Sequence, residues 1–447
     1  MNLRKAVLIG SGLLLLVLLS LRIHTRMQLN RMIAEIREAG EPVSHADLDA
    51  WYAAPPDEEN AALILTNAFA LLKVELTDAE KERLAFLGSA SIPPLGEPLA
   101  ADMLESMGDV VERHGEGLEL LEQGLSRPAA RYPGAVMTPD TEILGWSFFE
   151  GVDSRRVLNF LSEKAALEAE QGDVEAAVQT IIHSFKLSHT FHNQPLVISQ
   201  LIHMGNLRLS LGQSQRLLSR RQLTPDQLGQ LQPLVRRLAD GFDLSDAVAG
   251  ERAFSLHMAY VEPSMANRML AYGAAVWSEQ DASTWERLWI DVKMLTYRMS
   301  GIGDRDLMFY LDVMGKMQRA AQGTLQEQWE LSQVYPTWSP SGFGSRFYTL
   351  STMALPNFES FLSRGVETVL HLHAAECVLA VENYRHAHEG QLPENLEDLV
   401  PVFLERVIVD PRDQRPLRLE LKADGYSIEC SESLFTVKHP TRTTAED

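Results

Sequence analysis

Hydrophobic and polar residues alternate with a helical period along most of the chain. Apolar side chains recur every three or four residues over 158–170, 174–192, 196–218 and 357–388. This spacing places them on one face of a helix, where they can pack against a neighbour. The pattern therefore predicts a mostly α-helical protein with an irregular multi-helix body.

One pair of predicted helices resembles a tetratricopeptide hairpin. Ala165 and Ala177 flank a turn at Gly172 and Asp173, and such small residues let two helices approach closely. A tetratricopeptide array would repeat this pattern after about 34 residues, and no second unit follows at that distance. The sequence thus predicts a single helical hairpin within a larger helical body.

The period changes to two near the C-terminus. Leucines alternate over 417–421, apolar residues alternate again over 426–430, and Asp424 and Gly425 lie between these stretches. Alternation on both sides of an Asp-Gly pair is typical of a β-hairpin. We expect a small C-terminal α+β tail, in which the helix at 357–388 precedes an antiparallel sheet.

An uncharged apolar run at the N-terminus predicts a transmembrane helix. Residues 6–21 lie between Lys5 and Arg22, and the flanking basic side chains can extend the apolar run to the length that a bilayer requires. A cleaved signal peptide is the alternative, but it needs small residues at the cleavage site, and the run ends in Leu19-Ser20-Leu21. We therefore predict a single membrane anchor that the mature protein retains.

These patterns divide the chain into contiguous segments. We predict, in order, a membrane anchor with its flanks (1–31), an N-terminal helical subdomain (32–130), a main helical body (141–335), a loop or linker (336–356), a helix with a small antiparallel sheet (357–437) and a flexible tail (438–447).

The C-terminal segment resembles a known architecture. A helix containing Tyr384 is followed by Gly390-Gln-Leu-Pro393, then by Asp410-Pro411 and the two alternating stretches. This order is similar to the soluble tail of major pseudopilins of type II secretion. Large membrane-anchored helical bacterial proteins, notably of planctomycete-like lineages, carry a similar tail, and the chain looks most like that group. Residues 6–21 lack the acidic residue that pilus assembly requires, so the resemblance implies a shared tail and not a pilin.

The charge of the chain limits its expected location and the kinds of partner that it can bind. The 447 residues include 40 basic and 61 acidic side chains, a formal net charge of −21. This balance argues against nucleic acid as a partner, because phosphate binding needs clustered Lys and Arg. Five basic residues precede the first acidic one, Glu35, so the remainder carries 35 basic and 61 acidic groups, a net of −26. We expect an acidic body on the periplasmic side of a bacterial inner membrane.

Candidate chemistry is sparse. The chain has none of the common nucleophile, phosphate-loop or zinc-protease motifs, and Cys377 and Cys430 are too few for a cysteine zinc site. His189 and His192 share a helix face, and a turn at Pro195 could bring His203 beside them. Three imidazoles could bind a metal, although no nearby carboxylate orients them.

Two hypotheses follow. The first is a membrane-anchored envelope scaffold that binds another envelope protein, without a catalytic residue or a cofactor. The alternative is an envelope metal-dependent hydrolase that uses His189, His192 and His203. The sequence leaves the oligomeric state, the process and any pairing of the two cysteines open, and it favours the scaffold over the enzyme.

Overall fold

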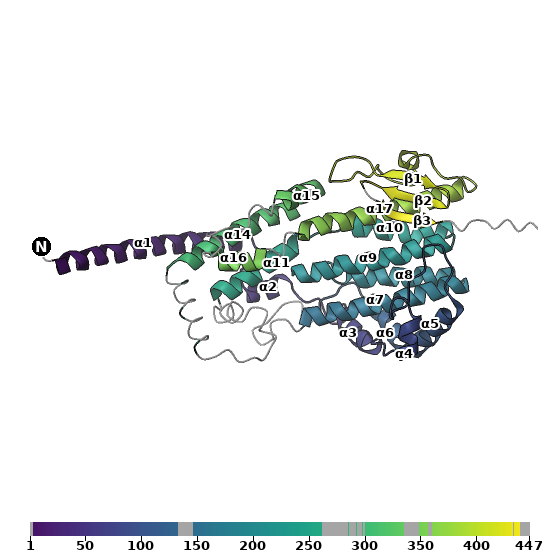
Figure 1. Ribbon diagram of the computed structural model, residues 1–447, viewed down its shortest axis with the longest axis horizontal. Helices are drawn as coiled ribbons and strands as arrows, with labels where there is room; N and C mark the ends of the chain where they lie inside the picture. The colour runs from purple at the N-terminus through teal and green to yellow at the C-terminus, as the bar shows by residue number, and fades with distance from the viewer. Residues whose placement is uncertain are drawn as a thin grey trace, which may run out of the picture. The chain divides into compact units, whose positions relative to one another are not determined.

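The chain is mainly α-helical and carries one small β-sheet (Figure 1). The computed structural model describes residues 3–132, 146–261, 300–334, 348–355, 360–431 and 433–438, together with Trp285, Val292 and Tyr297. The predicted mostly helical fold class is confirmed for these residues. Most of the predicted loop at 336–356 and all but residue 438 of the tail at 438–447 lie outside them.

Two compact units make up the fold, and each is assembled from two separate stretches of chain. Unit 1 comprises Met1–Ala53 and Ser245–Leu362, and unit 2 comprises Ala54–Leu244 and Ser363–Asp447. The segments predicted from sequence are contiguous, because a periodic pattern outlines neighbouring residues and does not show which distant stretches pack together.

The regular secondary structure in the described part of unit 1 is helical. Its elements are α1 (Leu3–Glu38), α2 (His45–Trp51), α11 (Ser245–Leu256), the short π-helix η1 (His257–Val261), α14 (Ile302–Ala321), α15 (Leu325–Val334) and α16 (Thr349–Ala354).

The second half of α1 packs into unit 1. Leu29 is buried against α14, and Arg26 forms a 3.0 Å ion pair with Asp304 of that helix. The side chains of residues 1–18 and of Leu21, which form most of the predicted membrane span, lie outside the described part of the chain. Within that described part, no helix is both long enough and apolar enough to cross a membrane.

A buried carboxylate organises the end of unit 1. Asp306 is fully buried and accepts hydrogen bonds from the backbone N–H groups of Leu350 (2.7 Å) and Ser351 (3.1 Å), and from the hydroxyl of Tyr297. These amides lie in the first turn of α16, where a negative charge is favoured. We predicted a loop here, and Thr349–Ala354 instead form a helix because Asp306 satisfies its N-terminal donors.

Unit 2 contains the remaining described helices and the sheet. Its elements are α3 (Ala62–Leu71), α4 (Asp78–Arg83), α5 (Ala101–Arg113), α6 (Gly115–Leu125), α7 (Trp146–Gln171), α8 (Val174–His189), α9 (Val197–Arg220), α10 (Pro225–Asp240), α17 (Phe361–Ala387, within unit 2 from Ser363), the 3₁₀ turn η6 (Leu396–Leu399), β1 (Arg418–Lys422), β2 (Gly425–Glu429) and β3 (Ser433–Lys438).

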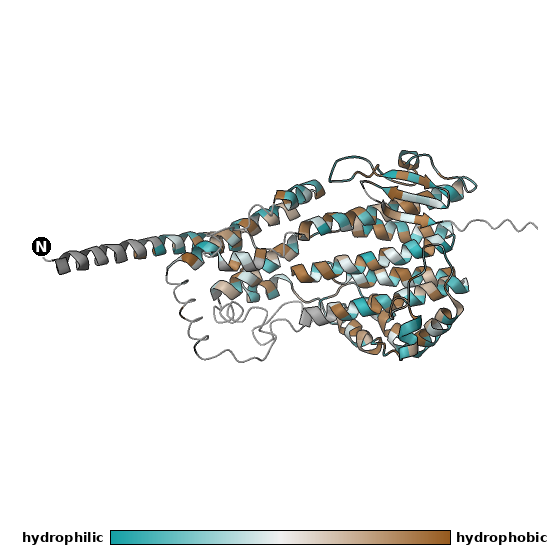
Figure 2. Ribbon diagram, viewed as in Figure 1, coloured by the Kyte–Doolittle hydropathy of each residue, from teal (hydrophilic) through white to brown (hydrophobic). Residues whose placement is uncertain are grey.

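The predicted helical hairpin is present in unit 2. Helices α7, α8 and α9 run side by side (Figure 1), and each carries both hydrophobic and hydrophilic residues (Figure 2). Gly172 adopts a positive φ of 85° between α7 and α8, which a glycine tolerates without strain. Asp173 then caps α8 by accepting a 3.0 Å hydrogen bond from the Ala176 amide.

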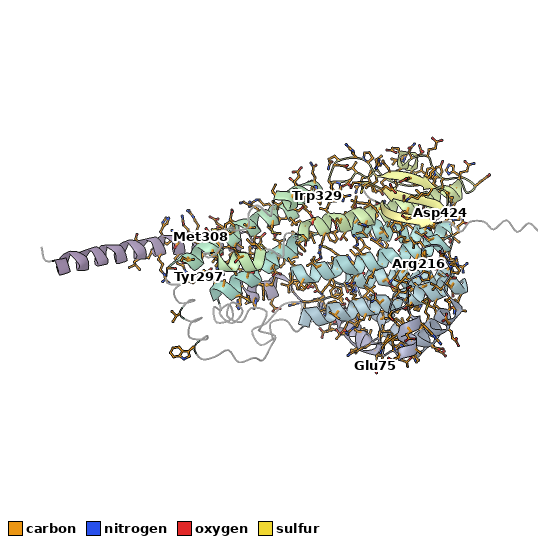
Figure 3. All side chains as sticks on the ribbon, in the orientation of Figure 1. Glu75, Arg216, Tyr297, Met308, Trp329 and Asp424 are labelled. Carbon is orange, nitrogen blue, oxygen red and sulfur yellow. The ribbon has the colours of Figure 1, made fainter. Side chains whose placement is uncertain are left out.

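The C-terminal tail is a helix with a three-stranded antiparallel sheet in the order β1-β2-β3. The predicted hairpin turns at Asp424, which Figure 3 labels, and Lys422 pairs with Gly425. Tyr426 on β2 is fully buried and donates a 2.8 Å hydrogen bond to Glu382 of α17. The third strand was not predicted, and it packs against α9, where the Ser219 hydroxyl accepts from the Lys438 amide.

The hairpin turn provides a test of the sheet. Gly425 has a φ of 153°, and a Cβ atom there would overlap the carbonyl oxygen of Val437. We expect Gly425→Ala to lower the free energy of unfolding by about 1–3 kcal/mol, measured by urea denaturation of the full chain in detergent. Hydrogen exchange should accelerate at the amides of β2 and β3.

Gly229→Ala is the matched control. Gly229 lies inside α10 with no atom within 4 Å of a new Cβ, so alanine there should stabilise by about 0.5–1 kcal/mol. Equal unfolding free energies for the two variants would contradict the close approach of β3 to the turn.

Candidate functional site

A groove in unit 2 lies between α7, α9 and the segment 86–99. Its volume is about 320 Å³, near the lower end of the range for ligand pockets. We call it the α7–α9 groove. Its apolar wall consists of Phe86, Ile92, Leu95, Leu99, Leu209 and Leu217, and its charged or polar lining consists of Glu97, Ser162, Glu170, Arg208, Gln213, Gln215, Arg216 and Arg220.

Glu163 of α7 holds the near end of the wall segment. Its carboxylate is fully buried, and its Oε1 accepts hydrogen bonds from the backbone N–H groups of Phe86 (2.7 Å) and Leu87 (3.0 Å). Burial raises the pKa of Glu163, while the bonds from these backbone amides oppose that rise. The two bonds fix Phe86 at the edge of the groove.

Two arginines of α9 hold the far end of the same segment. The Arg216 Nη2 donates to the Pro93 carbonyl at 3.0 Å, and the Arg220 Nη1 donates to the Gly96 carbonyl at 3.0 Å. Arg220 also binds Glu170 of α7 through two parallel 2.8 Å bonds, the geometry that gives guanidinium–carboxylate pairs their strength. The wall, α7 and α9 are thereby connected to one another.

Gln213, which lines the groove, carries a buried acceptor without a partner. Its Nε2 donates to the Leu158 carbonyl at 3.1 Å and to the Ser162 hydroxyl at 2.8 Å. A carbonyl can only accept, so this contact fixes the orientation of the amide. Gln213 is 7% exposed, and its Oε1 has no hydrogen-bond partner. An orphaned acceptor of this kind costs about 1–3 kcal/mol.

Arg216 adds an unpartnered donor three residues further along α9 (Figure 3). Its Nη1 is shielded from solvent and has no hydrogen-bond partner, and its guanidinium lies 5.8 Å from the centre of the Phe86 ring. Burial lowers the pKa of Arg216, and the nearby charge of Glu170 opposes that shift. The groove therefore contains a cation that is partly desolvated and incompletely bonded.

The groove is more positive than the chain around it. Three arginines and two glutamates line it, a net of +1 in a chain whose net charge is −21. Gly212 also lines it, and a Cβ built there meets no atom within 4 Å. A larger side chain at this position would consequently extend into the groove without striking the protein.

Sequence reasoning missed these residues, although their spacing carries a signal. Gln213, Arg216 and Arg220 are three and four residues apart, and Glu163 and Glu170 are seven apart. Each set therefore lies on one face of its helix. A helix face that packs against a neighbouring helix is normally apolar. Polar residues repeated along such a face indicate buried polar contacts, and this repeat is the signal in the sequence.

The structure also places the three predicted histidines near one another. The rings of His189 and His192 stack with centroids 3.9 Å apart and planes inclined by 18°, and the His203 ring lies 6.4 Å from that of His189. Stacked rings direct their nitrogen lone pairs along parallel planes and not toward one point. Among the described residues, no group of three or more His, Cys, Asp or Glu side chains is arranged to hold a metal.

The protonation of His203 follows from its neighbour Gln200. The Gln200 Nε2 lies within 3.0 Å of the carbonyls of Phe191, His192 and Gln194 and shares its two hydrogens among them. Its Oε1 therefore faces the His203 Nδ1 at 3.2 Å. That oxygen can only accept, and His203 is accordingly protonated on Nδ1. Its Nε2 is a buried acceptor without a partner, and burial lowers the pKa of His203 well below its ordinary value.

Comparison with known proteins gives no match. No family model, no curated protein and no solved structure matches the chain. The resemblance of residues 378–430 to pseudopilin tails therefore remains a prediction, and the functional conclusion depends on the geometry of the α7–α9 groove.

The burial of His203 predicts sensitivity to acid. The unfolded chain binds a proton at this residue near pH 6.5, whereas the folded chain resists protonation until well below that pH. Stability is therefore complete above pH 6.5 and declines as the pH falls below it. Each unit of pKa difference corresponds to about 1.4 kcal/mol. We expect the thermal midpoint of the full chain to fall between pH 7 and pH 5, and His203→Gln to reduce that fall.

Exposed His388 supplies the control, since His388→Gln should leave the pH profile unchanged. Burial also lowers the pKa values of His183, His189 and His192, so these residues contribute acid sensitivity of their own. His45 in unit 1, whose pKa burial and His257 lower to about 4, adds its own acid sensitivity, and the variant should remove only part of the fall. An identical fall in His203→Gln and the unaltered chain would refute the assignment.

Proposed function

We propose that this protein is an envelope scaffold, anchored in a bacterial inner membrane by residues 6–21, whose periplasmic body binds a partner protein in the α7–α9 groove. The observation that carries the proposal is the pairing, in one groove, of an apolar wall with two unsatisfied polar atoms, Gln213 Oε1 and Arg216 Nη1. Binding sites commonly combine an apolar lining with a few convergent polar groups.

The construction of the groove also supports recognition. Glu163, Arg216 and Arg220 fix its wall segment at three points along the chain. A surface that is ordered before binding loses less conformational entropy when a partner arrives. Flexible surface segments do not usually receive such buried anchors.

The histidine cluster does not support the alternative of a metal-dependent hydrolase. The rings of His189 and His192 stack on one another, and the Nδ1 of His203 is occupied by Gln200. A histidine that binds a metal is normally oriented by a carboxylate or carbonyl on its other nitrogen and directs the free nitrogen at the metal. His203 has that arrangement, because its Nδ1 donates to Gln200 and its Nε2 has no partner. However, among the described residues no group of three or more His, Cys, Asp or Glu side chains is arranged to hold a metal, so the scaffold is our proposal.

The membrane anchor is supported by the sequence of residues 6–21 and by the helix that follows. The helix α1 extends to Glu38 and packs into unit 1 from about Thr25 onward. An anchor of this kind would be joined to the body by continuous helix, without a flexible linker.

Site-specific crosslinking in cells of the source organism tests the groove. A photoreactive p-benzoylphenylalanine in place of Leu95, on the groove wall, should give a discrete protein adduct upon irradiation. The matched control carries the same amino acid in place of exposed Glu75 (Figure 3) and should not give that adduct. Gly212→Leu, which fills the groove, should remove the adduct from the Leu95 protein. Adducts that persist in Gly212→Leu, or none from Leu95, would rule out the groove as the binding surface.

Membrane extraction tests the anchor. Substitution of both Leu14 and Leu16 by Arg should move the protein from the carbonate-resistant membrane fraction to the soluble fraction, because each Arg near the centre of a span opposes insertion by about 2.5–3.5 kcal/mol. Val402→Arg, at a side chain that is 78% exposed, adds charge elsewhere and should leave the protein in the membrane. Release of the unaltered protein by carbonate would show that residues 6–21 do not span the bilayer.

A further inference from the structure

We propose that the α7–α9 groove recognises the free C-terminus of its partner chain, binding the terminal carboxylate together with an apolar last side chain. This inference rests on the proposed function and identifies the feature of the partner that the groove reads. Four properties of the groove support it: the unpartnered donor, the unpartnered acceptor, the shape of the apolar part and the local charge.

The unpartnered donor of Arg216 favours an anionic acceptor. Arg216 lines the groove, its Nη1 is shielded from solvent without a hydrogen-bond partner, and its Nη2 donates to the Pro93 carbonyl. Glu170, whose charge acts on Arg216, is engaged by Arg220 through both oxygens. A ligand carboxylate would complete the guanidinium's bonding through a charge-assisted hydrogen bond, the stronger kind in a poorly solvated site.

The acceptor distinguishes a peptide from other anions. Gln213 Oε1 is fixed as an acceptor by the Leu158 carbonyl on the other side of the amide, so the ligand must supply an N–H or O–H donor at this point. Gln213 and Arg216 lie one helical turn apart on α9, and both line the groove. A peptide terminus carries an amide N–H next to its carboxylate and can serve both. An ionised fatty acid carries the carboxylate but has no donor, so a lipid tail fits less well.

The apolar part of the groove fits one side chain and not a long segment. Part of the lining consists of small residues, Ala165, Ala166 and Ala169 of α7 and Gly212 of α9. The volume of about 320 Å³ is small for a ligand site. Such a space suits the last residue of a chain, with its side chain on the alanines and its carboxylate toward Arg216.

The charge of the groove favours an anionic end over a neutral or cationic one. Its lining has a net charge of +1 within an acidic protein, so a carboxylate is attracted there while the remaining surface repels it.

Retention of peptides by the full-length protein in detergent micelles tests the inference. The probe is a pool of N-acetylated hexapeptides with five randomised residues and a final Leu, prepared as the free acid and as the C-terminal amide. We expect the protein to retain the free acids at least tenfold more than the amides in equilibrium dialysis with detection by mass spectrometry. A second pool ending in Asp should be retained at least tenfold less than the Leu pool, because the apolar pocket rejects a charged side chain.

Two variants connect retention to the groove. Gly212→Leu should remove the preference for free acids by filling the space, and Arg216→Gln should remove it by deleting the cation. Gly229→Leu places the same side chain at an exposed position of α10, which does not line the groove, and should retain peptides as the unaltered protein does. Circular dichroism confirms folding of each variant, and Gly212→Leu remains decisive if Arg216→Gln does not fold.

Three results would overturn the inference: equal retention of acids and amides, displacement of the peptides by dodecanoate at equal concentration, or no retention of either pool. The crosslinking experiment separates this failure from failure of the proposed function. An adduct at Leu95 that depends on Gly212, combined with no preference for free acids, would keep the groove as a partner site and exclude recognition of a C-terminus.

Discussion

The buried carboxylate of Glu163 is the interaction on which the candidate site depends. A carboxylate inside a helical bundle is expensive to desolvate, and Glu163 offsets part of that energy by accepting from two backbone amides of the wall segment. The same segment is tied back by the Ser89 amide to the Lys81 carbonyl at 2.7 Å. The shape of the groove depends on this anchored start of the wall segment, because it places Phe86 near Arg216 and lets the residues after Phe86 reach the arginines of α9.

Each polar side chain of the groove is oriented by a neighbouring residue. Arg220 is oriented by Glu170, Arg216 is oriented by a carbonyl of the wall, and Gln213 is oriented by Leu158 and Ser162. Each of these bonds holds a side chain in one orientation, and that orientation sets the direction of its remaining polar atoms. The unsatisfied atoms are therefore held in place by satisfied neighbours, which is how a site is prepared for a ligand before the ligand is present.

Local patterns predicted the elements well, because helices and hairpins depend on residues that are close in sequence. The turn at Gly172 and the hairpin at Asp424 are examples of such local signals. The groove could not be predicted in this way, since its lining comes from residues 86–99, 162–170 and 208–220. Helix α16 was missed because its first turn is satisfied by Asp306, more than forty residues earlier. The third strand was missed because Leu434, Phe435 and Val437 are all buried, so the strand does not alternate cleanly.

The way the chain is shared between the two units has a consequence for its synthesis. The polypeptide passes from one unit to the other after Ala53, after Leu244 and after Leu362. Unit 1 lacks part of its residues until Leu362 has been made, and unit 2 lacks α17 and the sheet until Lys438 has been made. Neither unit can therefore complete its fold while only the N-terminal part of the chain has been synthesised. The face of α9 that β3 covers stays open while the more than 200 residues between them are made, and a chain released in that interval would carry two incomplete units.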